Sequence, residues 1–149
     1  MAVISDVHIQ PKYDPLANNT CFCNKICDGT QEIRPDVATS WYAPLGRLYC
    51  DPPQVLAESF LQKLQLEDPN LDILVVTGDI VGHTFSQDPW VPFDPQLYQT
   101  LLDVHKTFGK LIATYFPKTM VLPVFGNNDF MLHYQAPLPN NDQSRDFYS

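Results

Sequence analysis

Three clusters of polar residues stand where apolar runs of this chain end. They are Ser5-Asp6-Val7-His8 after Met1–Ile4, Gly78-Asp79 after Ile73–Thr77, and Gly126-Asn127-Asn128-Asp129 after Met120–Phe125. Open α/β sheets build their sites beyond the carboxyl ends of their strands. Carboxylate, imidazole and amide groups are ligands of divalent metals. The pattern therefore predicts a metal site formed by Asp6, His8, Asp79 and Asn127.

The spacing of these residues suits a pair of metal ions. Asp6 and His8 are two positions apart, so in an extended segment they point to the same side and can bind one ion. The carboxylate of Asp79 can bridge two ions, and the neutral amide of Asn127 leaves the second one strongly Lewis acidic. Two metals about 3.5–4 Å apart can hold a phosphate and stabilise its attacking and leaving oxygens. Asp6 and His8 alone could be a loop aspartate and a surface imidazole, and each of the other two clusters an ordinary turn, but three in series favour the site.

The elements that must position these clusters follow a β-α-β-α-β order, which predicts an α/β fold with a parallel sheet. Apolar runs predict strands within Met1–Asp6, Leu71–Thr77 and Thr119–Phe125. Leu71–Thr77 is continuously apolar, which is typical of a parallel strand covered on both faces.

Two helix starts stand out between the strands. Asp51 can cap the first helix, with Pro52 at its first position and Gln54 completing a capping box. Its predicted buried stripe is Val55, Leu56, Phe60 and Leu64. Asp94 and Pro95 begin the second helix, which Pro117 ends. We interpret His105, on the apolar face of that helix, as a core or boundary histidine.

The four cysteines, Cys21, Cys23, Cys27 and Cys50, all precede the first helix. They could be free thiols, a structural zinc site, or two disulfides stapling the long loop from Gln10 to Tyr49. No Cys-x-x-Cys pair is present, so disulfides are favoured over zinc. Disulfides imply an oxidising compartment. The spacing leaves their connectivity open.

Size and charge restrict the class of protein. The chain has 149 residues, 44% of them hydrophobic, which suffices for the core of one domain or part of one. Its net charge of -8 argues against nucleic-acid binding, which needs a basic face. No apolar run reaches the ~18 residues of a membrane span. Because the first strand begins at Met1 with no signal peptide before it, we expect the natural N-terminus to be missing.

At these residues the chain resembles the calcineurin-like metallophosphoesterases, whose pattern is Asp-x-His, Gly-Asp and Gly-Asn-His-Asp/Glu. The more specific likeness is to the acid sphingomyelinase-like phosphodiesterases and their endopolyphosphatase relatives. It rests on Ser5–His8, the cysteine-bearing loop, Gly46–Pro53 and Thr77–His83. The resemblance implies the N-terminal half of a helix-flanked double-sheet (αββα) sandwich over residues 1–135. Residues 136–149 would be a polar tail cut from a longer domain.

The resemblance also assigns roles to residues. Asp6 and His8 would bind the first metal, Asp79 would bridge, Asn127 would bind the second, and His83 would contact the substrate phosphate. It implies two divalent ions, zinc first with manganese or iron as alternatives, and a bridging hydroxide as nucleophile. It further implies a Cys27–Cys50 disulfide and a secreted, lysosomal or vacuolar location. The substrate would be a phosphate-containing small molecule, a lipid headgroup or polyphosphate.

Two departures from the family pattern bear on activity. Asn128, which we expect to be a catalytic residue, replaces a histidine of that pattern; an amide can donate a hydrogen bond but cannot act as a general acid. Endopolyphosphatase-like members resemble this chain in that change, which favours polyphosphate or another phosphate whose leaving group needs less proton assistance. The family's C-terminal Gly-His-x-His ligands are missing. The chain is therefore expected to be a phosphoester or phosphoanhydride hydrolase by lineage, with a non-catalytic, partner-binding remnant as the alternative.

Overall fold

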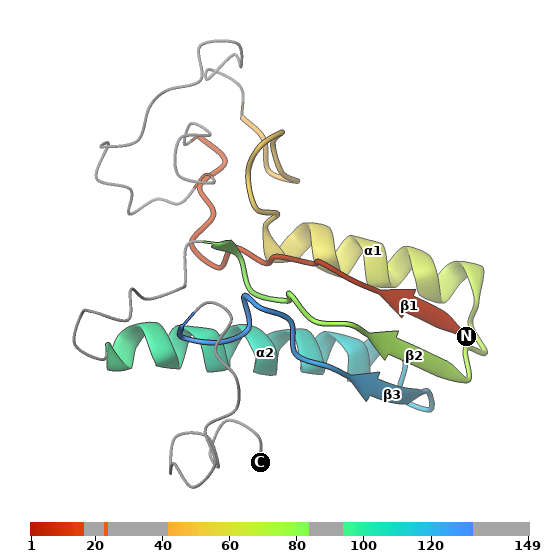
Figure 1. Ribbon diagram of the computed structural model, residues 1–149. Helices are drawn as coiled ribbons and strands as arrows, with labels where there is room; N and C mark the ends of the chain where they lie inside the picture. Colours follow the sequence, from red (N-terminus) through yellow and green to blue (C-terminus); the bar gives the residue numbers. More distant parts are fainter. Residues whose placement is uncertain (17–22, 24–41, 84–93, 133–149) are drawn as a thin grey trace, which may run out of the picture.

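The computed structural model describes residues 1–16, 23, 42–83 and 94–132, which form one parallel sheet and two helices (Figure 1). The elements are β1 (Ala2–Ile4), α1 (Gln54–Glu67), β2 (Ile73–Val76), α2 (Pro95–Tyr115) and β3 (Met120–Pro123). The predicted α/β class and its β-α-β-α-β order are confirmed. β2 and β3 end before their apolar runs do, so Gly78 and Gly126 lie beyond the strand ends, whereas Ser5 directly follows β1.

The sheet has the order β1-β2-β3, and all neighbours are parallel. Its register pairs Ile4 with Val76 and Val76 with Pro123, so the three carboxyl ends lie at the same edge. Beyond that edge the segments that follow β1 and β2 stay side by side, since the Ile9 N–H donates to the Ile80 carbonyl at 2.7 Å. Parallel pairing thus carries the three polar clusters to one place.

Both helices contribute to a single core against one face of the sheet. This core includes Ile4, Leu74 and Val76 of the strands, Ala57 and Leu61 of α1, and Leu101, Val104, Phe108 and Ile112 of α2. On the opposite face, Val3 of β1 and Leu122 of β3 are exposed. Within the described residues the sheet is therefore covered by helices on one face, whereas the apolar run of β2 predicted cover on both.

The start and the buried face of α1 both differ from the sequence prediction. The N-cap position is Pro53, with no side-chain cap, because the carboxylate of Asp51 is engaged elsewhere. The buried residues are Ala57 and Leu61; Leu64 is partly buried as predicted. The other predicted members of the stripe are exposed: Val55 (47%), Leu56 (39%) and Phe60 (48%).

The orientation of α1 follows from its contacts with the end of α2. The Tyr115 hydroxyl donates to Glu58 at 3.1 Å, and the Gln65 side-chain amide donates to the Tyr115 carbonyl at 2.9 Å. The apolar residues of α1 lie on more than one of its faces, so two adjacent stripes both fit the helical periodicity. The contacts with α2 select the stripe that contains Leu61.

The prediction for α2 is confirmed at its start and at its end. The Asp94 carboxylate accepts from the backbone N–H groups of Gln96 and Leu97, at 2.8 and 3.3 Å, and Pro95 occupies the first turn. The helix ends at Tyr115, two residues before Pro117. Neither helix in the described ranges carries an apolar stretch of the length needed to cross a bilayer.

The structure corrects the disulfide pairing. Cys50 is bonded to Cys23, with 5.4 Å between their Cα atoms, and not to Cys27. Cys23 is fully buried, and its carbonyl accepts from the Asp14 N–H at 2.9 Å, which holds it beside Cys50. Spacing could not distinguish the two candidates. Cys21 and Cys27 lie outside the described residues.

Candidate metal centre

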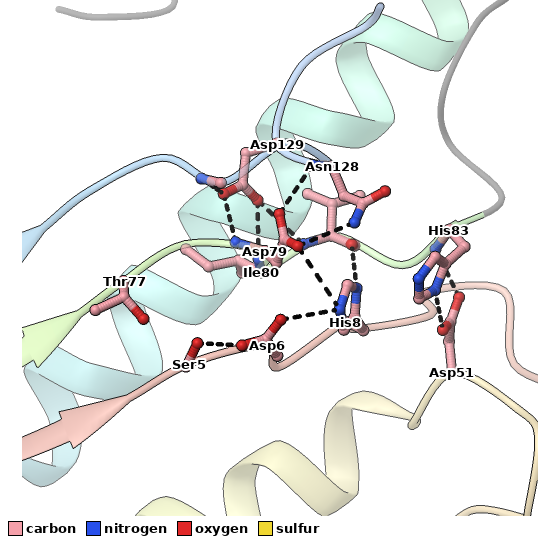
Figure 2. Close-up of polar contacts among 12 residues, drawn as sticks. Ser5, Asp6, His8, Asp51, Thr77, Asp79, Ile80, His83, Asn128 and Asp129 are labelled. Atoms are coloured by element: carbon pink, nitrogen blue, oxygen red, sulfur yellow. Dashed lines mark hydrogen bonds and ion pairs between the residues drawn. The ribbon is translucent and has the colours of Figure 1, made fainter. Parts of the chain in front are cut away.

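Asp6, His8 and Asp79 converge at the carboxyl edge of the sheet (Figure 2). Their potential ligand atoms all lie within 4.8 Å of one another. The Nε2 atom of His8 is 3.7 Å from Oδ1 of Asp6 and 3.9 Å from Oδ2 of Asp79. The Asp6 side chain is 65% exposed, whereas those of His8 and Asp79 are 15% and 14% exposed. The cluster therefore opens to solvent on the side of Asp6.

All three of these residues have left-handed backbone conformations. Their φ angles are 55° for Asp6, 47° for His8 and 53° for Asp79. Such conformations are uncommon outside glycine, cost about 1–3 kcal/mol each and cluster at functional sites. Hydrogen bonds between the two loops hold them, since the His8 N–H donates to the Asp79 carbonyl at 2.9 Å. The backbone is thus bent at each of the three candidate ligands.

The imidazole of His8 is oriented by the backbone of the second loop. Its Nδ1 atom lies 3.2 Å from the carbonyl oxygen of Val81. A carbonyl only accepts, so Nδ1 carries the proton in this contact and Nε2 faces Asp6 and Asp79. A ring N–H donated to a carbonyl is the usual arrangement for a metal-binding histidine.

The carboxylate of Asp79 receives two hydrogen bonds from the loop after β3. The Asn128 backbone N–H donates to Oδ1 at 2.9 Å, and its side-chain amide donates to Oδ2 at 3.1 Å. Close approach of the two loops requires Gly126, because a Cβ atom there would collide with the Asp79 backbone and carboxylate. Asn128, predicted as a catalytic residue, is buried and directed at Asp79.

Asp129 joins the ends of β2 and β3 and was missed as a functional residue by sequence reasoning. It is fully buried. Its Oδ2 accepts from the N–H groups of Asp79 and Gly126 at 2.8 and 2.7 Å, and its Oδ1 from those of Ile80 and Val81 at 2.8 and 3.3 Å. The acidic residue that ends the Gly-Asn-His-Asp/Glu pattern was the signal that pointed to Asp129.

His105 packs beside Asp129, in agreement with its interpretation as a core or boundary histidine. Its Nε2 lies 3.7 Å from Asp129, and its ring meets Phe125 edge-on at 5.5 Å. Burial lowers the pKa of His105, because desolvation disfavours the imidazolium, and the nearby Asp129 carboxylate partly offsets this.

A second pair of polar residues, His83 and Asp51, lies beside the ligand cluster. The ring of His83 stacks on that of His8, with 4.3 Å between centroids, and is 43% exposed. Asp51 contacts both the backbone and the ring of His83. The sequence predicted His83 as a site residue but assigned Asp51 to a helix cap.

The remaining predicted ligand, Asn127, is half-buried in the loop after β3, between Gly126 and Asn128. The structure therefore places Asn127 on the same edge as the other three ligands. Residues 133–149 lie outside the described ranges, so the predicted boundary at residue 135 stays a prediction.

The donor set of this edge fits divalent cations. Two carboxylates brought this close repel each other unless a cation lies between them. One imidazole with carboxylate oxygens is a set that zinc, manganese and iron accept. A cluster of this kind at the carboxyl edge of a parallel sheet is the arrangement in which α/β domains place a metal site.

Comparison with known sequences identifies the family. The family model described as calcineurin-like phosphoesterase matches residues 1–148. The chain belongs to the calcineurin-like phosphoesterase family. This confirms the resemblance drawn from the three polar clusters.

The chain is similar to curated sphingomyelinase-type proteins. It is 29% identical over 139 residues to acid sphingomyelinase-like phosphodiesterase 3b of Homo sapiens, covering 93% of this chain and 27% of that protein. It is 32% identical over 138 residues to sphingomyelin phosphodiesterase A of Dictyostelium discoideum, covering 93% of this chain and 21% of that protein. The chain thus spans about a quarter of the length of these relatives.

Proposed function

We propose that this chain carries the two-metal centre of a phosphodiester hydrolase, with Asp6, His8, Asp79 and Asn127 as metal ligands. The observation that carries the proposal is the convergence of Asp6, His8 and Asp79 within 4.8 Å, each on a left-handed backbone. Cation binding would offset the backbone strain and the close approach of acidic groups at this sheet edge.

Each ligand has a proposed role. Asp6 and His8 would hold the first ion, Asp79 would hold both, and Asn127 would hold the second. Divalent cations there supply positive charge and Lewis acidity to a bound phosphate. The hydrogen bonds from Asn128 keep Asp79 in the orientation that a shared ligand needs. Zinc is the proposed metal, with manganese or iron as alternatives.

His83 is the proposed contact to the substrate phosphate. Its ring lies against His8 and stays partly exposed, so a phosphate held by the metals would lie within its reach. The relatives named as sphingomyelin phosphodiesterases favour a lipid phosphodiester as substrate. The endopolyphosphatase alternative rests on the Gly126-Asn127-Asn128-Asp129 motif. A secreted or lysosomal location is proposed, and the Cys23–Cys50 disulfide supports it.

Calorimetric titration of the purified chain with zinc and with manganese tests the metal centre. Tight binding of two ions supports the proposal, while weak or single-site binding supports the non-catalytic remnant. Hydrolysis of bis(p-nitrophenyl) phosphate by the loaded chain tests the activity. Asp79→Asn should abolish both metal binding and hydrolysis. Asp72→Asn, which removes an exposed carboxylate just before β2, is the matched control and should change neither.

The substrate class is tested with two further assays on the same preparation. Release of phosphocholine from sphingomyelin supports the lipid phosphodiester. Release of phosphate chains from polyphosphate, with sphingomyelin left intact, would instead support the endopolyphosphatase type.

A further inference from the structure

We infer that Asp51 is a positioning residue that sets the orientation and the protonated nitrogen of His83. This inference rests on the proposed function, in which His83 contacts the substrate phosphate. Oδ2 of Asp51 accepts from the His83 backbone N–H at 2.7 Å, and Oδ1 lies 2.8 Å from the ring Nδ1. One carboxylate therefore holds both the backbone and the ring of the same residue.

The environment of Asp51 indicates that its contact with His83 is a fixed part of the fold. Its side chain is only 5% exposed, although it belongs to the segment just before a helix. Burying a carboxylate is costly unless hydrogen bonds compensate, and His83 provides both of the hydrogen bonds described above. The neighbouring Cys23–Cys50 disulfide and the bond from Gln10 N–H to the Pro52 carbonyl, 2.8 Å, fix the segment on either side.

Gly82 makes room for the carboxylate. A Cβ atom at this position would lie 2.7 Å from Oδ2 of Asp51 and 3.2 Å from the Ile9 carbonyl oxygen. Any side chain there would push Asp51 away from His83. The small size of Gly82 thus lets the buried carboxylate of Asp51 approach His83.

The same carboxylate could be read as a ligand of a further metal ion, because Asp51, His8 and His83 have ligand atoms within 4.8 Å. The contacts favour the positioning role. Nε2 of His8 faces Asp6 and Asp79, and its Nδ1 contacts the Val81 carbonyl. Both oxygens of Asp51 are directed at His83.

The positioning has a chemical consequence for His83. A carboxylate only accepts, so its partner Nδ1 carries the proton, and Nε2 is the atom through which the ring would meet a phosphate. The contact also prevents rotation of a ring that is otherwise 43% exposed. Asp51 thereby acts on substrate through His83 without touching it.

A double-mutant cycle on the metal-loaded full chain tests the coupling, with bis(p-nitrophenyl) phosphate as probe. His83→Ala should lower kcat about 100–1000-fold, as expected for loss of one positioned acid–base group at the reacting phosphate. Asp51→Asn keeps the shape but replaces an oxygen by an NH2 group, and should lower kcat about 10–100-fold with KM and zinc affinity unchanged. In the His83→Ala background the same change should alter kcat less than about twofold. Asp72→Asn is the matched control in both backgrounds.

Two measurements keep the test independent of folding defects and of turnover. Gly82→Ala retains every charge and should reproduce the kcat loss of Asp51→Asn by displacing the carboxylate. Long-range proton–nitrogen NMR should show His83 protonated at Nδ1 in the wild-type chain and at Nε2 in Asp51→Asn, with no substrate present.

The outcomes separate this inference from the proposed function. Wild-type chain that binds no metal and hydrolyses nothing would overturn the proposed function, while the NMR signature of His83 would still decide the pairing. Additive effects in the cycle, or an unchanged His83 tautomer in Asp51→Asn, would overturn the positioning role. A zinc affinity that falls with Asp51→Asn would overturn it in favour of a metal ligand.

Discussion

Asp129→Asn should destabilise the fold by about 3–6 kcal/mol, because the wild-type carboxylate accepts four backbone hydrogen bonds while fully buried. An amide retains one accepting oxygen, so the N–H donors on one side lose their partner. These are either those of Asp79 and Gly126 or those of Ile80 and Val81. Hydrogen bonds to a charged acceptor contribute about 1.5–3 kcal/mol each, and two of them are lost.

Urea unfolding followed by circular dichroism measures this loss. A small domain has about 5–15 kcal/mol of stability, so the variant should unfold at a much lower urea concentration. Asp103→Asn is the control, because its exposed carboxylate accepts a single hydrogen bond, from Gln99 at 2.8 Å. That variant should stay within about 0.5 kcal/mol of wild type.

The same substitution should also weaken metal binding. The N–H of Asp79 is one of the donors to Asp129, so loosening it disturbs the ligand that is proposed to hold both ions. Zinc affinity should fall about 10–100-fold. A stability loss below about 1 kcal/mol, with zinc affinity unchanged, would refute the view that Asp129 holds the two loops together.

The remaining predictions concern the core, the disulfide and pH. Leu61→Ala should cost about 2–5 kcal/mol in urea unfolding, whereas Phe60→Ala, half-exposed, should cost about 1 kcal/mol. Cys23→Ser should cost about 2–4 kcal/mol, and peptide mapping of the wild-type chain should recover a Cys23–Cys50 peptide. Because burial lowers the pKa of His105, the unfolded chain binds the proton first, and stability should fall as pH drops below about 6.5. His105→Gln should reduce that fall between pH 7 and pH 5.

Each of these has a clear contrary result. Equal costs for the two α1 variants would contradict the buried face that contains Leu61. Recovery of a Cys27–Cys50 peptide in place of Cys23–Cys50 would restore the pairing that the family resemblance implied. A pH profile of unfolding that is unchanged in His105→Gln would contradict the lowered pKa of that histidine.

Sequence patterns predicted the structure correctly where it depends on residues that are close together along the chain. The cap at Asp94 and the ending before Pro117 act within one helical turn, so the bounds of α2 followed from residue type. Apolar runs of strand length likewise predicted the three strands. The candidate ligands Asp6 and Asp79 could be named because a parallel sheet must bring the ends of its strands to one edge.

Local patterns failed where a residue had two acceptable partners. Asp51 suits a helix cap as well as a buried hydrogen-bond acceptor, and only the fold brings His83 to it across 32 residues. Phe60 and Leu61 lie on adjacent stripes of one helix, and contacts with α2 decided between them. Periodicity and spacing carry no information about such choices.

The family, the order of the elements and the edge where the polar clusters gather all follow from patterns along the chain. The tertiary structure alone decided which buried carboxylates hold that edge together. Asp129 and Asp51 owe their roles to backbone N–H groups and a ring that come from distant parts of the chain. Hydrogen bonds of this kind depend on three-dimensional proximity, which no spacing along the chain encodes.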